Sequence, residues 1–197
     1  MDDRLPVPPP LPSPMSGEDR TQLARAAELH APIARAARLG VRNGTCYAAF
    51  GALSLLFAVV GLDAVGLALG AVLLGVGFEE RRQSTRLRNA DAAAPLRLVR
   101  VELTLLGAIV LYGVLGLTVF PAAADAVKGH LHDTVGLGNM VRLADSINRT
   151  WYTSVIGISV LYQGGMARYF HRRRDDVERY GQAVPAWARE VVEAMAK

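Results

Sequence analysis

The sequence is poor in the residues from which redox, metal and cofactor sites are usually built. A single cysteine, Cys46, excludes an intrachain disulfide and any redox chemistry that needs two thiols. None of the four histidines lies in the long uncharged runs, which excludes a haem held by histidines inside membrane helices. His130 and His132 stand two apart, so a helix would point them to different faces, and a metal site needs three or four ligands.

Motifs of the common enzyme classes are missing as well. The chain has no P-loop, no zinc-protease motif, no Gly-x-Ser-x-Gly elbow and no paired-aspartate phosphotransfer signature. We therefore expect a protein that is not an enzyme and that binds no cofactor and no metal ion.

Charged residues are absent from four segments, at 44–62, 64–78, 103–124 and 150–167, and crowd between them. An α-helix rises about 1.5 Å per residue and the bilayer core is about 30 Å thick, so roughly 17 to 25 apolar residues match a membrane span. The second segment is short, so its helix needs polar flanking residues at the interface. The pattern predicts an all-α, polytopic membrane protein with amphipathic flanking helices and four transmembrane helices, at about 44–62, 64–80, 101–121 and 150–169.

The same pattern has two alternative explanations, namely a soluble bundle with fully buried helices, and a re-entrant hairpin at 44–78 in place of two spans. In a soluble bundle each outer helix would carry a polar stripe. Residues 53–62 show no such stripe, which favours lipid as their surroundings.

The distribution of lysine and arginine predicts the orientation. Nineteen of the 22 basic residues lie in the two tails and the middle connection, and only Lys128, Arg142 and Arg149 lie on the other side. Because basic residues near membrane ends stay in the cytoplasm, both termini are expected there. The excess of arginine over lysine favours a bacterial inner membrane. Topology already explains the positive charge, so we expect no nucleic-acid partner.

The remaining regions flank a predicted transmembrane domain at 43–170. Residues 1–15 hold most of the prolines and predict an extended or disordered tail. Residues 16–42 predict a cytoplasmic amphipathic helix. Residues 171–197 predict a basic, amphipathic cytoplasmic helix that docks on the N-terminal one.

Local signals mark the expected ends of helices. Ser16 and Asp19 resemble a capping box. Residues 61–63 leave room only for a tight turn between the first two spans, and residues 89–91 are expected to break the helix that follows. The outer segment at 121–150 has two apolar series and predicts two short amphipathic helices that cap the bundle or lie on the outer surface.

Few polar residues fall inside the predicted spans, and each is a candidate for interhelical hydrogen bonding or for lining a pore. The polar intramembrane candidates are Glu102, Tyr112 and Gln163. Glu102 lies at the cytoplasmic end of the third span, near several arginines. We expect it to form an ion pair with one of three residues, Arg97, Arg100 or Arg168.

Two further sets of residues are predicted to mediate contacts. Small residues let helix backbones approach closely, and an arginine near an acidic leaflet gains about 1 kcal/mol. The helix-packing candidates are Gly66, Gly70, Gly113, Gly116, Gly157 and Gly164. The candidates for contact with anionic lipid headgroups are Arg81, Arg82, Arg172, Arg173 and Arg174.

The leading hypothesis is a non-enzymatic membrane protein that acts as a small assembly or accessory subunit, by self-association or by binding a membrane partner. One alternative is an oligomeric channel or transporter for ions or small solutes, with a pore lined by Tyr112 and Gln163 and guarded by Glu102. A weaker alternative is a lipid-modifying enzyme at the cytoplasmic surface. That enzyme would need a polar cleft that contains Glu79, Glu80 and Glu102.

Overall fold

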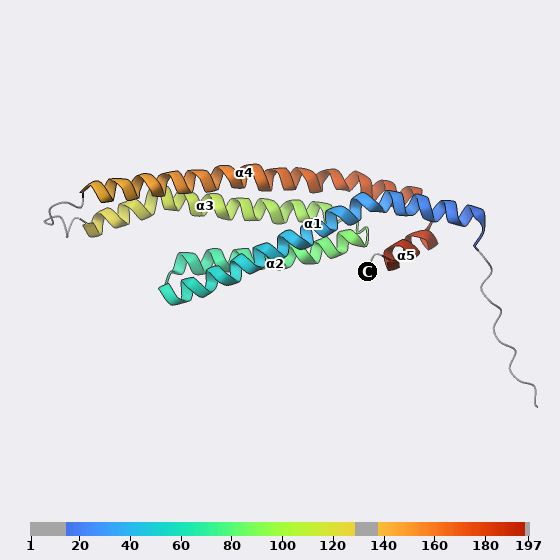
Figure 1. The fold of residues 1–197 in the computed structure, drawn as a ribbon, viewed down its shortest axis with the longest axis horizontal. Helices are drawn as coiled ribbons and strands as arrows, with labels where there is room; N and C mark the ends of the chain where they lie inside the picture. Colours follow the sequence, from blue (N-terminus) through green and yellow to red (C-terminus); the bar gives the residue numbers. More distant parts are fainter. Residues whose placement is uncertain (1–14, 129–137, 196–197) are drawn as a thin grey trace, which may run out of the picture.

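A computed structural model describes residues 15–128 and 138–195, with side chains described except at 120–128, 138–142 and 144. Within these residues the chain forms five helices and no strand, which confirms the all-α class. Figure 1 shows them as an elongated array. The helices are α1 (Gly17–Gly61), α2 (Ala64–Arg88), α3 (Ala94–Lys128), α4 (Gly138–Ala183) and α5 (Ala186–Met195).

The four long helices form two hairpins. α1 packs along α2, and α3 packs along α4. The hairpins meet at the end of the bundle that carries Arg38, Arg88, Arg97 and Arg172, which we call the basic end. Away from it the α1–α2 hairpin diverges from α3 and α4 (Figure 1).

Two helices are long and apolar enough to cross a membrane, namely α1 and the part of α3 at Ala94–Val119. Only 17% and 28% of their most apolar segments are buried, so most of this apolar surface faces outward. α2 and α4 fall short for separate reasons. The charge-free run of α2 is short, and that of α4 contains polar residues such as Ser154 and Gln163. Four spans thus stay a prediction from the sequence.

The helix ends follow the local sequence signals. Ser16 and Asp19 form the expected capping box, with the Asp19 backbone N–H donating to the Ser16 hydroxyl at 3.1 Å. The turn between α1 and α2 has Leu62 at a φ of 52°, and the Asp63 carboxylate accepts from the Val65 N–H at 3.0 Å. Ala90, at a φ of 53°, ends the helical path after α2. The predicted turn and break are both confirmed.

Two predicted boundaries do not appear as breaks. α1 joins the predicted helix at 16–42 to the first predicted span, and it continues through Pro32. Likewise α3 continues through residue 121 to Lys128, and α4 begins at Gly138. The described parts of the outer segment are therefore extensions of α3 and α4 rather than separate short helices. His130, His132 and residues 1–14 of the predicted tail lie outside the described residues.

An apolar cluster at the basic end holds the two hairpins together. Its largest fully buried members are Ile33, Leu87, Leu98, Phe170 and Tyr180, which come from all four long helices. Small residues of α1 complete it, and α5 adds Ala188 and Val192. α5 therefore docks on α1, the arrangement that the sequence suggested.

One hydrogen bond links α1 to the end of α2 at this cluster. His30, only 3% exposed, places its Nε2 atom 2.8 Å from the backbone carbonyl oxygen of Arg88. The carbonyl groups in the last turn of a helix lack partners within that helix. An N–H from the His30 ring satisfies one of them here.

Candidate functional site

Polar side chains form a buried layer directly beyond the apolar cluster of the basic end. Each of the four long helices contributes at least one polar residue to this layer. On each helix that residue lies one to three turns away from a residue of the apolar cluster. A second, smaller apolar cluster of Val76, Val101 and Leu105 lies on its other side. We call this set the polar layer. Its buried members are Asn43, Glu80, Gln83, Ser84, Glu102 and Gln163, and the half-buried Tyr47 adds its buried hydroxyl group.

Two carboxyl groups dominate the polar layer. Glu80 of α2 and Glu102 of α3 are both 0% exposed. They lie within electrostatic range of each other and of the Tyr47 hydroxyl group of α1. Within the described part of the chain, none of their four carboxyl oxygens has a hydrogen-bond partner. A buried carboxylate is costly unless a proton, a cation or hydrogen-bond donors compensate it.

The expected ion pair of Glu102 is not formed. Glu102 continues the inward face of α3 that carries Leu98 and Leu105, whereas the expected partners Arg97 and Arg100 are exposed. Neighbouring positions on a helix point in different directions, so proximity in sequence did not bring these charges together. Arg168 on α4 is exposed as well.

The burial of Glu80 was not predicted from the sequence. Its spacing could have indicated it, because Glu80 stands four residues from Val76 and seven from Leu87, on the face of α2 that carries these apolar residues. Glu79, its neighbour, lies on a different face and is partly exposed. The three carboxyl groups of the lipid-enzyme hypothesis therefore do not line one cleft.

The other two polar candidates lie apart from each other. Gln163 of α4 is 5% exposed and belongs to the polar layer, and its Oε1 atom has no partner among the described residues. Tyr112 lies ten residues beyond Glu102 on α3, which is about 15 Å along the helix. Its ring meets the Tyr152 ring edge-on at 5.6 Å between centroids. The structure therefore gives Tyr112 a packing contact between α3 and α4.

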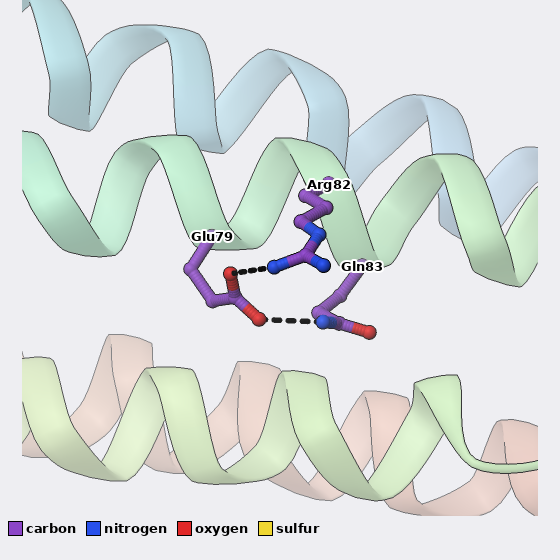
Figure 2. Close-up of polar contacts among 3 residues, drawn as sticks. All are labelled: Glu79, Arg82 and Gln83. Carbon is purple, nitrogen blue, oxygen red and sulfur yellow. Dashed lines mark hydrogen bonds and ion pairs between the residues drawn. The ribbon is translucent and has the colours of Figure 1, made fainter.

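A basic pocket opens beside the polar layer, between α2 and α3, with a volume of about 650 Å³. Figure 2 shows Glu79 and Gln83 pointing from α2 into this space. Glu79 accepts a hydrogen bond from Gln83 Nε2 and forms an ion pair with Arg82 at 3.6 Å. The four arginines that line the pocket are Arg82, Arg86, Arg97 and Arg100.

The predicted lipid-contact arginines occupy different settings. Arg82 lines the basic pocket, and Arg81 lies on another face of α2, next to Gly44. Arg172 and Arg174 of α4 are exposed. Arg173 donates to Asp176 at 2.6 Å and lies over the Tyr169 ring at 4.6 Å, so its charge is already engaged.

Glycines bring α1 and α2 into backbone contact. A Cβ atom on Gly77 would lie 2.5 Å from the backbone nitrogen of Ala48, and one on Gly51 would lie 2.5 Å from that of Leu74. A Cβ atom on Gly44 would lie 2.7 Å from the carbonyl oxygen of Gly77. These three glycines were not among the predicted packing residues, because the partner of each could not be read from its own helix.

The six predicted packing glycines divide into two groups. Gly70 lies against Leu55, Gly66 against Asp63 and Ala58, Gly113 against Ile156, and the Tyr152 ring covers Gly116. At Gly157 and Gly164 a Cβ atom would have nothing within 4 Å. The first four therefore pack inside this chain, and the last two leave α4 open for a contact from outside it.

Comparisons of the chain with protein-family models, curated proteins and solved structures find no match. Within the residues that the structure describes, no group of three or more histidine, cysteine, aspartate or glutamate side chains is arranged to hold a metal ion. The polar layer, the basic pocket and the open face of α4 are the features of the described chain that bear on function.

Proposed function

We propose that this chain is an integral membrane protein with four spans and both termini in the cytoplasm, and that it serves as a non-enzymatic accessory subunit. In this role it associates with itself or with another membrane protein. The observation that carries the proposal is an open face on α4, which we call the small-residue face. Its members are Ser154, Gly157, Gly164 and Gly165.

The small-residue face has the properties of a helix–helix contact. Ser154 and Gly157 stand three residues apart, and Gly164 and Gly165 follow two helical turns later on the same side of α4. A Cβ atom on any of the three glycines would meet nothing else of the described chain within 4 Å. In membranes, association depends on close backbone approach, which small residues allow. Leu161, 79% exposed, lies between the glycines and offers a side chain for packing by a partner helix.

The exposed apolar surface supports the membrane location. On α1 the residues Phe50, Leu53, Phe57 and Val60 recur at three and four, and each is at least 48% exposed. A water-soluble protein would rarely leave so long an apolar row exposed to solvent. The same row suits the lipid chains of a bilayer.

The arrangement of charge supports the orientation. The described parts of the cytoplasmic segments predicted from the sequence lie together at the basic end of the bundle, although they are far apart along the chain (Figure 1). The turn at Leu62 lies at the opposite end of the α1–α2 hairpin. A single membrane crossing by each long helix accounts for this separation.

Association is tested by replacing the open glycines with a bulky residue. Gly157→Leu and Gly164→Leu should weaken self-association or partner binding about tenfold, because overpacking costs about 1–3 kcal/mol. The fold should persist, since neither glycine contacts another part of the described chain. Gly107→Leu is the matched control, because Gly107 is equally open but lies on α3.

The measurement is native mass spectrometry after extraction in mild detergent and after reconstitution in nanodiscs. The wild type and the control should show an oligomer or a bound partner protein, and the α4 variants should lose it. A wild-type chain that is monomeric and partner-free in every lipid and detergent would refute the subunit role.

A second candidate function, transport of protons or small cations, is favoured by the polar layer. Buried ionisable groups within membrane spans are costly and commonly mark ion or proton pathways. In liposomes that contain a pH-sensitive dye, the wild type should pass protons under an applied gradient. Glu80→Gln and Glu102→Gln should remove that flux, and vesicles as tight as protein-free ones would exclude this function.

A further inference from the structure

Beyond the basic pocket, a second, apolar pocket lies between α2 and α3. On α2 the residues that line the two pockets recur at three and four from Val65 to Arg86, and on α3 they recur likewise from Arg97 to Leu115. Both pockets therefore lie along the same face of each helix. We call the two pockets together the α2–α3 groove.

The groove is strongly basic at one end. Arg82 and Arg86 of α2 face Arg97 and Arg100 of α3, with Glu79 as the one carboxylate among the lining residues. Glu79 is already paired with Arg82. Within the described part of the chain, the other three arginines form no ion pair. Their charge is available to an anion from outside the chain.

Buried hydrogen-bonding capacity adds to this charge. Gln83 lines the basic end and is 2% exposed. Its Nε2 atom is held by Glu79, while its Oε1 atom has no partner among the described residues. A ligand hydroxyl group beside the anion would satisfy this acceptor.

Beyond Gly75 the groove becomes apolar. Val65, Leu69 and Val72 line it on α2, and Ala108, Leu111 and Leu115 line it on α3. From Val65 to Gly75 the helix rises about 15 Å, which is half of the roughly 30 Å hydrocarbon core of a bilayer and so matches the length that one acyl chain occupies in it.

We propose that the α2–α3 groove binds one anionic phospholipid. The phosphate lies among Arg86, Arg97 and Arg100, a headgroup hydroxyl donates to Gln83, and an acyl chain follows the apolar part of the groove. The combination distinguishes a phospholipid from a soluble phosphate compound, which would use the arginines but leave the apolar walls uncovered. This inference rests on the membrane location proposed above.

The headgroup contact is tested with the double variant Arg97→Gln/Arg100→Gln. Detergent-solubilised protein is titrated with phosphatidylglycerol, and bound lipid is counted by native mass spectrometry. Two arginines each contribute about fivefold to anionic lipid binding, so affinity should fall roughly thirtyfold. Arg25→Gln/Arg35→Gln removes the same charge from exposed positions on α1 and should bind nearly as well as the wild type. An equal loss in both double variants would overturn the site.

The acyl contact is tested with Ala108→Trp, which fills the apolar part of the groove. Val114→Trp, on an exposed face of α3 outside the groove, is its control. Only Ala108→Trp should reduce the amount of bound phosphatidylglycerol. Unchanged binding by Ala108→Trp would show that no chain enters the groove.

Three further measurements test the source of the phosphate, the role of the arginines and the membrane insertion on which the proposal rests. Glycerol phosphate should not compete with phosphatidylglycerol at equal concentration, and full competition would identify a soluble ligand instead. Phosphatidylcholine should bind more weakly, and equal binding would contradict the role of the arginines. Carbonate extraction of each variant from membranes reports insertion independently, so loss of lipid binding is not confused with failure to insert.

Discussion

Tyr180 shows how burial at the basic end makes the fold sensitive to alkaline pH. Burial raises the pKa of its phenol from its ordinary value near 10 to about 12, with a smaller contribution from the Glu193 carboxylate and an opposing one from Arg189. Because the folded-state pKa is the higher one, the neutral phenol's contribution is fully present below pH 10 and is lost as pH rises through 12.

Tyr180→Phe should remove this sensitivity. Its hydroxyl group has no hydrogen-bond partner among the described residues, so the variant should change stability by less than about 1 kcal/mol at pH 7. Between pH 10 and 12 the variant should become more stable than the wild type by up to about 2–3 kcal/mol. Thermal unfolding at a series of pH values measures both. A variant that loses stability in parallel with the wild type would show that other groups cause the alkaline loss.

The polar layer makes a prediction about single residues as well. Glu80→Met and Glu102→Met each remove a buried carboxyl group that lacks a hydrogen-bond partner within the described chain. Each should raise the free energy of unfolding by about 1–3 kcal/mol, since the desolvation cost of that group disappears. Denaturant unfolding in detergent provides the measurement. A fall in stability of similar size would mean that the carboxyl groups are satisfied in the folded protein.

At the scale of a helix, the α1–α2 hairpin depends on backbone contact at its glycines. Gly77→Ala should destabilise the hairpin by about 1–3 kcal/mol, because the new methyl group would meet the backbone of α1. Gly75→Ala is the matched control on the same helix, where the Cβ atom meets nothing within 4 Å. It should be neutral or stabilise slightly, as alanine favours helix. Equal effects in thermal unfolding would argue against close packing.

Helix ends could be predicted from the sequence because their signals are local. The box at Ser16 and the turn at Leu62 each depend on neighbouring residues alone. Packing partners could not be predicted in the same way. Gly77 meets Ala48, and Glu102 faces inward away from Arg100, because of how two helices are aligned. One helix taken alone carries no information about that alignment.

At the scale of the whole molecule, the sequence predicted the segregation of charge from apolar surface, and the structure adds the division into two hairpins. The two hairpins are joined near the basic end, where Leu87 of one and Phe170 of the other lie in the shared cluster. Phe170→Ala should cost about 3–5 kcal/mol and separate the hairpins, as cavity formation in a core does. Increased protease cleavage at residues 89–91 would report this separation, and an unchanged cleavage rate would contradict it.

The central claim is that each long helix crosses the membrane once, with the basic end in the cytoplasm. It is tested most directly by labelling single cysteines with a membrane-impermeant thiol reagent in intact bacterial cells. In a Cys46→Ser background, Leu62→Cys, Asn89→Cys and Gln182→Cys probe three exposed turns and ends. With four spans, only Leu62→Cys is labelled before the cells are permeabilised. If only α1 and α3 crossed, Asn89→Cys would be labelled in intact cells too, and that result would contradict the four-span account.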